Sequence, residues 1–290
     1  MINSIKAFSP AHITGFFDPY FDRDARKSGS RGAGISLSLG VTAKVSAIPS
    51  NKQSIEVYIN KKPVDAYTTK LAIKNLIGDT LSKIKVEIVQ SLPLSQGFGL
   101  SGAGALSAAL ATARLFGLSR IDALEAAHNS EVIYRTGLGD VLAESFGGIE
   151  IRKSPGLPPW GEIEHIPGNS EVVVCVIGNK LSTSEILNNP EIVKRIRTNA
   201  RYCLTSLLEN PSLENLLIQS YRFTRNVGLA DDKIMKAIEM ANNYGIASMC
   251  MLGNSIFAIG ETEKLTKALS VFGKVFRCTI DQQGARIIEE

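Results

Sequence analysis

Alternating apolar and polar positions mark the first part of the chain, up to about residue 90, as rich in strands. The alternation is clear in four stretches, at residues 5–8, 35–48, 55–59 and 84–89. A period of two is typical of strands that bury one face. We therefore predict a sheet in this region, with its strands joined by polar turns.

Helical patterns begin after a glycine-rich stretch at residues 93–104. Alanine and leucine dominate residues 105–116, and both have high helix propensity, so we predict a helix there. A second helix is predicted at 122–135, where Ser119 is placed to cap the first turn. Strand, glycine-rich loop and helix thus follow one another in this part of the chain.

The second half of the chain mixes helical spacing with short apolar runs. Residues 155–168 are rich in Pro and Gly, as expected of a connection between domains. We predict an α+β fold of two domains, residues 1–156 and 157–290. The elements predicted in the second domain are strands at 172–177, 248–252, 256–259 and 275–280, and helices at 191–208, 213–227 and 233–244.

Composition is that of a globular protein. The chain has 290 residues, 44% of them hydrophobic, and a net charge of +4, which favours anionic ligands only weakly. No run approaches the length of a membrane span, and the N-terminus lacks the pattern of a secretory signal. The four cysteines are far apart without a Cys-x-x-Cys pair, so we expect buried free thiols and a cytoplasmic protein.

The glycine-rich stretch has the features of an anion site. Four glycines precede the predicted helix, so backbone N–H groups can approach a phosphate without obstruction by side chains. The Ser101 hydroxyl is a candidate contact for Mg²⁺ or a phosphate oxygen. A tight turn that allows close helix packing explains the glycines equally well. The stretch is not a Walker A loop, because no Lys-Ser or Lys-Thr pair follows the glycines at the required distance.

Two acidic residues flank a second glycine-bearing turn. Glu131 lies late in a predicted helix, and Asp140 follows it after the segment Gly137-Leu138-Gly139. Phosphoryl transfer uses one carboxylate to hold Mg²⁺ and another to orient or deprotonate the acceptor hydroxyl. The alternative from the residues alone is a solvated glutamate and an aspartate that caps a helix.

The loop resembles the ATP loop of the GHMP kinases, whose form is Pro-x-x-x-Gly-Leu-Gly-Ser-Ser-Ala. Here the sequence is Pro93-x-x-x-Gly97-Phe98-Gly99-Leu100-Ser101-Gly102. Leu100 replaces the first serine of the family, and Gly102 replaces its alanine. The resemblance implies that Pro93, Gly97, Gly99, Ser101 and Gly102 bind ATP.

The acidic pair matches the same family. GHMP kinases carry an acidic metal ligand before a glycine-bearing turn, and then an aspartate followed seven residues later by Gly-Gly; Gly147-Gly148 has this spacing from Asp140. The resemblance implies that Ser101 and Glu131 hold Mg²⁺ and that Asp140 is the catalytic aspartate. Whether Asp140 removes the proton or positions the hydroxyl is left open by the sequence.

The N-terminal segment 7–17 and the stretch 29–34 are similar to the archaeal pantoate kinase branch of this family. The resemblance implies ATP-dependent phosphorylation of pantoate on its primary hydroxyl. His12 stands where better-known members have a cation, and it could donate a hydrogen bond to substrate or to Asp140, although an isolated histidine is commonly structural.

Two further residues are candidates for holding the pantoate carboxylate. Arg152 follows the Gly147-Gly148 pair on a short predicted strand, and Thr183 lies in a Ser-Thr-Ser cluster after residues 172–177. An arginine can bind a carboxylate through two hydrogen bonds. The alternatives are a surface or domain-linking arginine and a threonine that caps a helix.

The resemblance spans nearly the whole chain and implies the GHMP fold. The N-terminal domain is then ribosomal protein S5 domain 2-like, the C-terminal domain is ferredoxin-like, and ATP lies between them. Residues 251–255 resemble a reduced form of the third, glycine-rich motif of the family, although an ordinary hairpin turn explains Gly253-Asn254 as well.

Rival functions remain open at this point. They are a GHMP kinase for shikimate, homoserine or mevalonate, and a ligand sensor or RNA-binding protein that uses Lys194, Arg195, Arg197 and Arg201. That basic segment lacks interleaved aromatic residues, so it is more typical of a solvated helix face. We expect ATP and a small-molecule substrate as partners, neither nucleic acid nor membrane, and a homodimer as one candidate assembly.

Overall fold

Two β-sheets organise the chain in the computed structural model, which describes residues 4–179, 186 and 188–290. The first sheet and the elements packed with it are β1 (Ser4–Tyr20), η1 (Ala25–Lys27), β2 (Gly29–Pro49), β3 (Ser54–Ile59), β4 (Lys62–Pro63), α1 (Tyr67–Ile77), β5 (Ser82–Gln90), α2 (Leu100–Phe116), α3 (Arg120–Tyr134), α4 (Asp140–Phe146), β6 (Ile149–Ser154), β7 (Glu162–Ile166) and β12 (Arg286–Glu289). The remaining elements are β8 (Glu171–Val176), α6 (Pro190–Glu209), α7 (Leu213–Val227), α8 (Asp232–Ala241), β9 (Gly245–Met249), β10 (Ser255–Gly260), α9 (Thr262–Leu269) and β11 (Lys274–Thr279).

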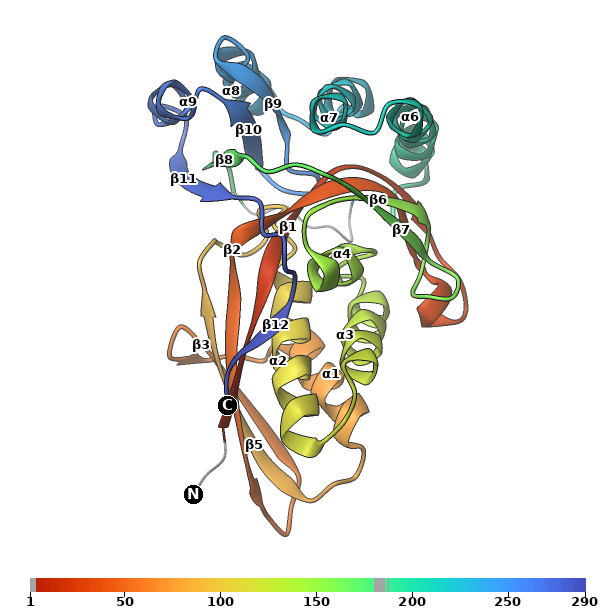
Figure 1. Ribbon diagram of the computed structural model, residues 1–290, viewed down its shortest axis with the longest axis vertical. Coiled ribbons are helices and arrows are strands. Elements are labelled where there is room, and N and C mark those ends of the chain that lie inside the picture. The colour runs from red at the N-terminus through yellow and green to blue at the C-terminus, as the bar shows by residue number, and fades with distance from the viewer. Residues whose placement is uncertain (1–3, 180–185, 187) are drawn as a thin grey trace.

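The first sheet has the strand order β12-β1-β2-β5-β3-β4, and β6 and β7 extend it from β2. Its strands are antiparallel except for the parallel pair β3 and β5. Helices α1, α2 and α3 cover one face of this sheet (Figure 1). The alternation predicted at 84–89 is visible in β5, where Ile84, Val86 and Ile88 are buried and the residues between them are exposed. The predicted strand pattern of this region is therefore confirmed.

Helix α2 packs closely against the sheet because most of its residues are small and buried. Most of its alanines and glycines are buried, and Gly117 ends it in the left-handed conformation at φ 70°. The helix begins at Leu100, five residues before the predicted start, because the glycine-rich segment itself forms its first turn. Helix α3 begins after Ser119, whose side chain accepts from the Asp122 N–H, as predicted.

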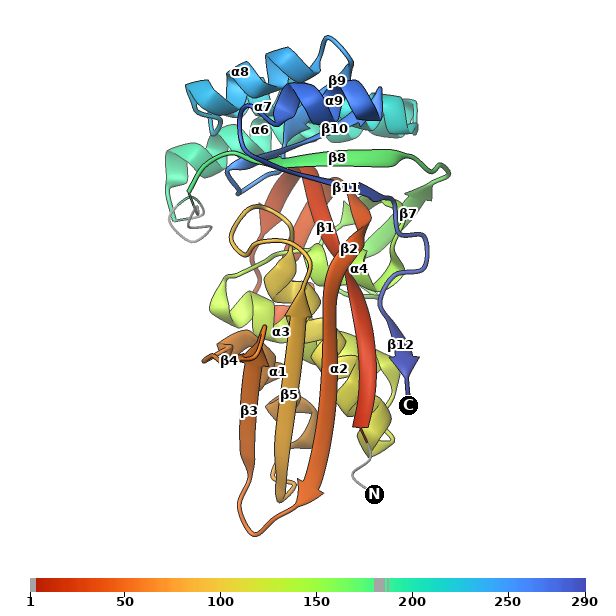
Figure 2. The same cartoon turned by 90° about the vertical axis from the view of Figure 1, so that its left-hand side faces the viewer.

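The second sheet has the order β11-β8-β10-β9, with all neighbours antiparallel. Counted along the chain this is the order 4-1-3-2, with helices between the first and second strands and between the third and fourth. That is the ferredoxin-like arrangement, so the α+β prediction is confirmed. Helices α6 to α9 cover the side of this sheet that faces away from the first one (Figure 2).

Strands β1 and β2 connect the two halves of the molecule. They are 17 and 21 residues long, and they run from the first sheet to the underside of the second half (Figures 1 and 2). The ring centroids of Phe16 and Phe17 lie 6.3 and 6.1 Å from that of Phe223 on α7. A Cβ at Gly15 would lie 2.1 Å from the Ser220 hydroxyl, so glycine allows this close approach without displacing that side chain.

Several elements differ from the prediction. The strand predicted at 248–252 begins and ends three residues earlier, as β9. Helices α1 and α9 were not predicted. Both helices are short, so each offers few turns of helical pattern. Strand β7 lies within the predicted connection 155–168; most of its side chains are exposed, so it lacks an apolar pattern and depends on pairing with β6.

The division of the chain between residues 156 and 157 remains a prediction. Strand β7 pairs with β6, and β12 pairs with β1, so both belong to the first sheet. This pairing favours a division between β7 and β8, with the end of the chain returning to the first half. The four cysteines are buried free thiols, as predicted, and none of the described helices is long and apolar enough to cross a lipid bilayer.

The turn between β9 and β10 gives a first testable prediction. A Cβ at Gly253 would lie within 2.2 Å of three backbone atoms of Gln96 and Gly97. Gly253→Ala should therefore displace the glycine-rich loop and lower the free energy of unfolding by about 1–3 kcal/mol, the scale of overpacking. Chemical denaturation measures this change.

Gly104→Ala is the matched control. The nearest atoms to a Cβ at Gly104 are 3.8 and 4.0 Å away, an ordinary contact, and alanine is a better helix former than glycine. This variant should be as stable as the wild type or more so. Equal stability losses in the two variants would contradict the steric explanation.

Candidate active site

The glycine-rich loop joins β5 to α2 and is held from both halves of the molecule. Gly97 and Gly99 have φ values of 77° and 63°, and Gly99 forms the N-cap of α2. The His12 backbone N–H donates to the Phe98 carbonyl at 3.0 Å, and the Ser255 hydroxyl donates to the Gln96 carbonyl at 2.5 Å. The first N–H groups of a helix lack partners within the helix, so this loop presents donors suited to an anion.

A cavity of about 320 Å³ lies against this loop. Five residues predicted as site residues line it: Gly97, Gly99, Ser101, Glu131 and Asp140. Its walls also include the turn that carries Met251 and Leu252, from the segment predicted as the third motif. The three stretches singled out in the sequence therefore meet at one cavity.

Ser101 and Glu131 are direct neighbours in the cavity. The Ser101 hydroxyl donates to Glu131 Oε1 at 2.7 Å, and the Thr136 hydroxyl donates to the same oxygen at 2.6 Å. Burial raises the pKa of Glu131 to about 7, and the charge of Asp140 adds to the rise, while the two hydroxyl donors act against it. A cation bound beside Glu131 would stabilise its ionised form and so lower its pKa again.

A third carboxylate, which the sequence analysis did not single out, lies beneath the loop. Both side-chain oxygens of Glu144 are buried without a hydrogen-bond partner among the described residues. Burial, followed by the charges of Asp140 and Glu131, raises the pKa of Glu144 well above its usual value. No motif in the chain points to Glu144, because it lies within the apolar pattern of the helix that follows Asp140.

Glycines provide the space for these carboxylates. A Cβ at Gly137 would lie 2.2 Å from Glu131 Oε2 and 3.0 Å from Asp140 Oδ2. A Cβ at Gly99 would lie 2.5 Å from Glu144 Oε1. The glycines therefore do more than allow turns, since side chains there would displace the acidic groups.

The residues present fit a magnesium ion. Hydroxyl and carboxylate oxygens are the hard ligands that Mg²⁺ prefers, and Ser101, Glu131 and Asp140 supply them at one cavity. In the described part of the chain, no group of three or more His, Cys, Asp or Glu forms a cage around a metal position. Magnesium is usually held by one or two carboxylates together with substrate phosphates.

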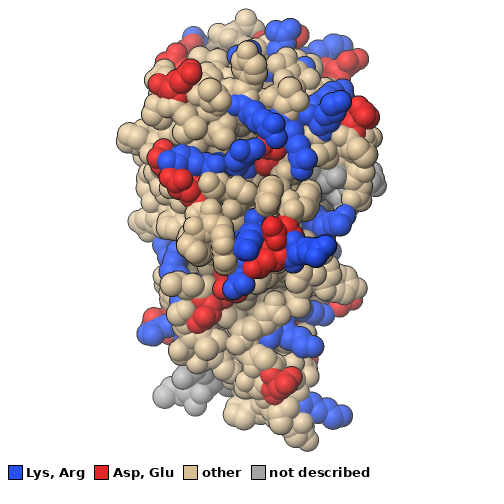
Figure 3. Space-filling model, turned by 90° about the vertical axis from the view of Figure 1, so that its right-hand side faces the viewer, with Lys and Arg blue, Asp and Glu red and all other residues tan. Residues whose placement is uncertain are grey.

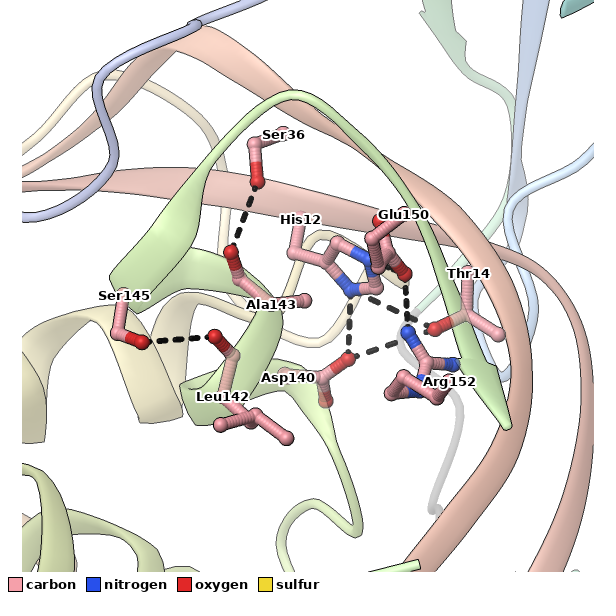
Figure 4. Close-up of polar contacts among 9 residues, drawn as sticks. All are labelled: His12, Thr14, Ser36, Asp140, Leu142, Ala143, Ser145, Glu150 and Arg152. Atoms are coloured by element: carbon pink, nitrogen blue, oxygen red, sulfur yellow. Dashed lines mark hydrogen bonds and ion pairs between the residues drawn. The ribbon is translucent and has the colours of Figure 1, made fainter. Parts of the chain in front are cut away.

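Four charged side chains form a row that begins with Asp140 at the cavity and continues behind it through three buried residues (Figure 4). Asp140 Oδ1 lies 2.9 Å from His12 Nδ1, and His12 Nε2 lies 2.9 Å from Glu150 Oε1. Arg152 Nη1 donates to the same Glu150 oxygen. The order Asp140, His12, Glu150, Arg152 alternates in charge when His12 is protonated, and we call this set the charge row.

The charge row sets the protonation of its members. Burial would lower the pKa of His12, but the charge of Glu150 and the hydrogen bonds with Asp140 and Glu150 raise it to about 8. With an acceptor oxygen at each ring nitrogen, both nitrogens donate, so the ring is a cation at neutral pH. Burial would raise the pKa of Asp140, but hydrogen bonding and charge from His12, with help from Arg152 and Thr14, lower it below its usual value.

His12 thus places a positive charge at the position where the sequence resemblance implies a cation. A Cβ at Gly34 would lie 2.4 Å from His12 Nε2, so a glycine there makes room for the ring. The predicted hydrogen bond to Asp140 is present. Both ring nitrogens are already engaged within the protein, so contact of His12 with a substrate stays a prediction.

Arg152 is buried, with 1% of its surface exposed, and lies behind the cavity wall formed by Ser30 and Gly139. It is therefore not the surface arginine weighed as an alternative. Its Nε is buried and has no hydrogen-bond partner among the described residues, so one donor of the guanidinium is left unsatisfied, and Arg152 itself does not line the cavity. Pro93 and Gly102 do not line the cavity, and Thr183 lies outside the described residues.

Two polar residues of this site could have been found from strand periodicity. Thr14 lies two residues after His12 on β1, and its hydroxyl donates to Asp140 Oδ1 at 3.4 Å. Glu150 lies two residues before Arg152 on β6. Residues two apart in a strand share a face, so His12 predicts that Thr14 lies beside it, and Arg152 predicts the same of Glu150.

Comparison with known proteins agrees with this geometry. Residues 66–148 match the family model described as GHMP kinases N terminal domain. Pantoate kinase from Thermococcus kodakarensis is 35% identical over 271 residues, covering 91% of this chain and 90% of that protein. Pantoate kinase from Methanocaldococcus jannaschii is 35% identical over 274 residues, covering 94% of this chain and 99% of that protein.

This chain belongs to the pantoate kinase family of the GHMP kinases.

Solved structures place the chain in the same group. A structure described as a phosphotransferase related to the CoA biosynthesis pathway superposes with a TM-score of 0.91 at 31% identity, covering 99% of both chains. Homoserine kinase from Cytophaga hutchinsonii superposes with a TM-score of 0.73 at 19% identity, covering 99% of this chain and 98% of that one, which shows the shared fold. This GHMP kinase is therefore an ATP-dependent phosphotransferase with the two-part α+β fold predicted from its motifs.

The charge row of this GHMP kinase predicts a pH-dependent stability. The pKa of His12 is raised on folding from about 6.5 to about 8, so its stabilising charge is fully present below pH 6.5 and is lost as the pH rises through 8. The difference in unfolding free energy between wild type and His12→Asn should be largest near pH 6 and shrink toward pH 9. Denaturation curves across this range measure it.

His165→Asn is the control for this prediction. His165 is an exposed histidine on β7, outside the charge row. Its substitution leaves the charge row intact, so it should not reproduce the pattern expected of His12→Asn. A His12→Asn difference that grows above pH 8 would contradict the assignment of a buried cation.

Proposed function

We propose that this protein transfers the γ-phosphoryl group of ATP to the primary hydroxyl of pantoate, giving 4-phosphopantoate and ADP for coenzyme A biosynthesis. The observation that carries the proposal is the charge row. It holds one carboxylate at the phosphate cavity and ends in an arginine that keeps a free donor. The relatives named pantoate kinase support the choice of acceptor.

The glycine-rich loop is assigned to the ATP phosphates. Backbone N–H groups at the start of α2 and the Ser101 hydroxyl would face the phosphoryl oxygens. Pro93 and Gly102 shape the loop and the helix start beside Gly97 and Gly99. When bound, Mg²⁺ would be held by Ser101 and Glu131 and would neutralise the charge that develops on the transferred group.

Asp140 is assigned to the acceptor hydroxyl. Its Oδ1 is occupied by His12, whereas Oδ2 lies beside Gly137 at the cavity. Its lowered pKa makes it a weak base, which suits a loose transition state in which the aspartate orients the hydroxyl and receives its proton late. His12 is then a positioning residue that keeps Asp140 ionised and oriented.

Arg152 is assigned to the pantoate carboxylate. Pantoate has its carboxylate at one end and the reacting hydroxyl at the other, so the carboxylate must be held for the hydroxyl to be aimed. The unpaired Nε of Arg152 supplies a charge-assisted donor behind Ser30 and Gly139. Thr183 remains a predicted second contact for pantoate, and a cytoplasmic location and a homodimer also remain predictions.

The decisive experiment offers acceptors one at a time. Purified protein with ATP and Mg²⁺ should release ADP with pantoate as the only acceptor. Little release should occur with homoserine, mevalonate or shikimate. A stronger response to one of these acceptors, or RNA binding without ATP turnover, would overturn the proposal.

Asp140→Asn tests the catalytic assignment. The substitution keeps the size of the side chain and one acceptor oxygen for His12, but it removes the charge that receives the proton. Turnover should fall roughly 10²-fold or more, while ATP binding measured by calorimetry stays close to that of the wild type. Near-normal turnover would remove Asp140 from the mechanism.

Arg152→Lys tests the carboxylate contact while keeping a cation beside Glu150. A lysine cannot reproduce the planar donor set of the guanidinium. The KM for pantoate should rise about tenfold or more, and the KM for ATP should change little, which is the pattern of lost substrate binding. Equal changes in both KM values would indicate a general disturbance of the site.

A further inference from the structure

A second cavity, of about 630 Å³, lies on the face of the molecule away from the phosphate loop. Its walls come from the ends of β1 and β2, from β6 and the segment after it, and from α6. Five Lys or Arg side chains line it against two Asp side chains. Lys153 is paired with Glu162 and Glu164, so the excess of positive charge comes from Lys27 and the three arginines. Figure 3 views this side of the molecule and shows Lys and Arg side chains gathered across it.

One buried carboxylate organises the arginines. Asp18, whose side chain is 5% exposed, contacts Arg31, and it lies 3.8 Å from Arg197 Nε and 3.6 Å from Arg201 Nε. A single negative charge among three guanidiniums leaves a net positive charge. Each arginine has five N–H donors, so most of their donors stay available to a ligand.

The cavity also has an aromatic wall. Trp160, the only tryptophan of the chain, is 40% exposed and lines the cavity. Arg26 Cζ and Lys27 Nζ lie 5.2 and 5.3 Å from the centre of a Trp160 ring. Arg26 is paired with Asp24, whereas Lys27 lines the cavity beside the ring. An exposed ring next to cavity-lining cations is suited to a ligand that has both an aromatic ring and phosphate groups.

The second cavity is separate from the active site although the two share strands. Ser30 lines the active-site cavity, whereas the next residue, Arg31, lines the second one. On β6, Arg152 belongs to the charge row, whereas Lys153 lines the second cavity. Successive side chains of a strand point to opposite faces, so β2 and β6 form a wall between the two cavities.

We propose that this second cavity binds a nucleoside phosphate, with its phosphates on Arg31, Arg197 and Arg201 and its base against Trp160. The charge excess matches a ligand with two or more negative charges. The basic helix segment considered for RNA in the sequence thus takes part in a small-molecule site. Arg197 and Arg201 line the cavity, whereas Lys194, on the same helix, does not.

Trp160 allows a direct test, because its fluorescence reports on this cavity alone. ADP should change the fluorescence saturably in the wild-type protein, and inorganic pyrophosphate should bind more weakly because it lacks the base. The double variant Arg197→Gln, Arg201→Gln should weaken the ADP response at least about tenfold, the scale of one lost hydrogen bond to a charged group. Its KM for ATP at the active site should stay unchanged, which also shows that it folds.

Lys194→Gln is the matched control, since it removes a charge from the same helix outside the cavity. Its ADP response should stay within about twofold of the wild type. Ser101→Ala, in the phosphate loop, should leave the Trp160 response unchanged. A response that follows Ser101 instead of the two arginines would mean that ADP acts from the active site and would overturn the proposal.

Three further results would also overturn it. One is the absence of any saturable fluorescence change with ADP. Another is equal affinity for ADP and pyrophosphate, which would exclude the contact between the base and Trp160. The third is tighter binding of a short RNA than of ADP, with a steep dependence on salt, which would assign the basic surface to nucleic acid.

Discussion

The buried charge row is the interaction on which the site depends. Charges removed from water are tolerated only when they are paired and hydrogen-bonded, so Arg152, Glu150, His12 and Asp140 must be assembled together. They come from β6, β1 and the start of α4, and their pairing therefore fixes how these segments meet. Loss of one member would leave its neighbour as an unpaired buried charge.

The charge row also explains a division of labour among the carboxylates. Asp140 is kept ionised by the cation next to it, whereas Glu131 and Glu144 have raised pKa values because each is buried near other acidic groups. One acidic group is thus prepared to receive a proton before any ligand arrives. A bound cation would favour the ionised forms of Glu131 and Glu144. Glycines nearby leave the space that all three carboxylates require.

Strands β1 and β2 link the site to the second half of the molecule. They carry His12, Thr14 and Gly34 on one side, and through Phe16 and Phe17 they pack on α7 of the second half. The same strands carry Asp18 and Arg31 to the second cavity. The active-site cavity and the second cavity therefore share one wall, and alternate residues of that wall line one cavity or the other.

The sequence by itself determined the α+β class, the glycine-rich loop, and the family to which its motifs belong, because periodicity and short motifs are local properties. Strand alternation could also have pointed to Thr14 and Glu150 beside His12 and Arg152. Only the tertiary structure decided the pairing of His12 with Asp140 and Glu150, the burial of Arg152, and the place of Glu144 beneath the loop. The pairing of His12 joins residues more than a hundred positions apart. The other two features depend on burial, which also sets the pKa of each group and cannot be read from neighbours along the chain.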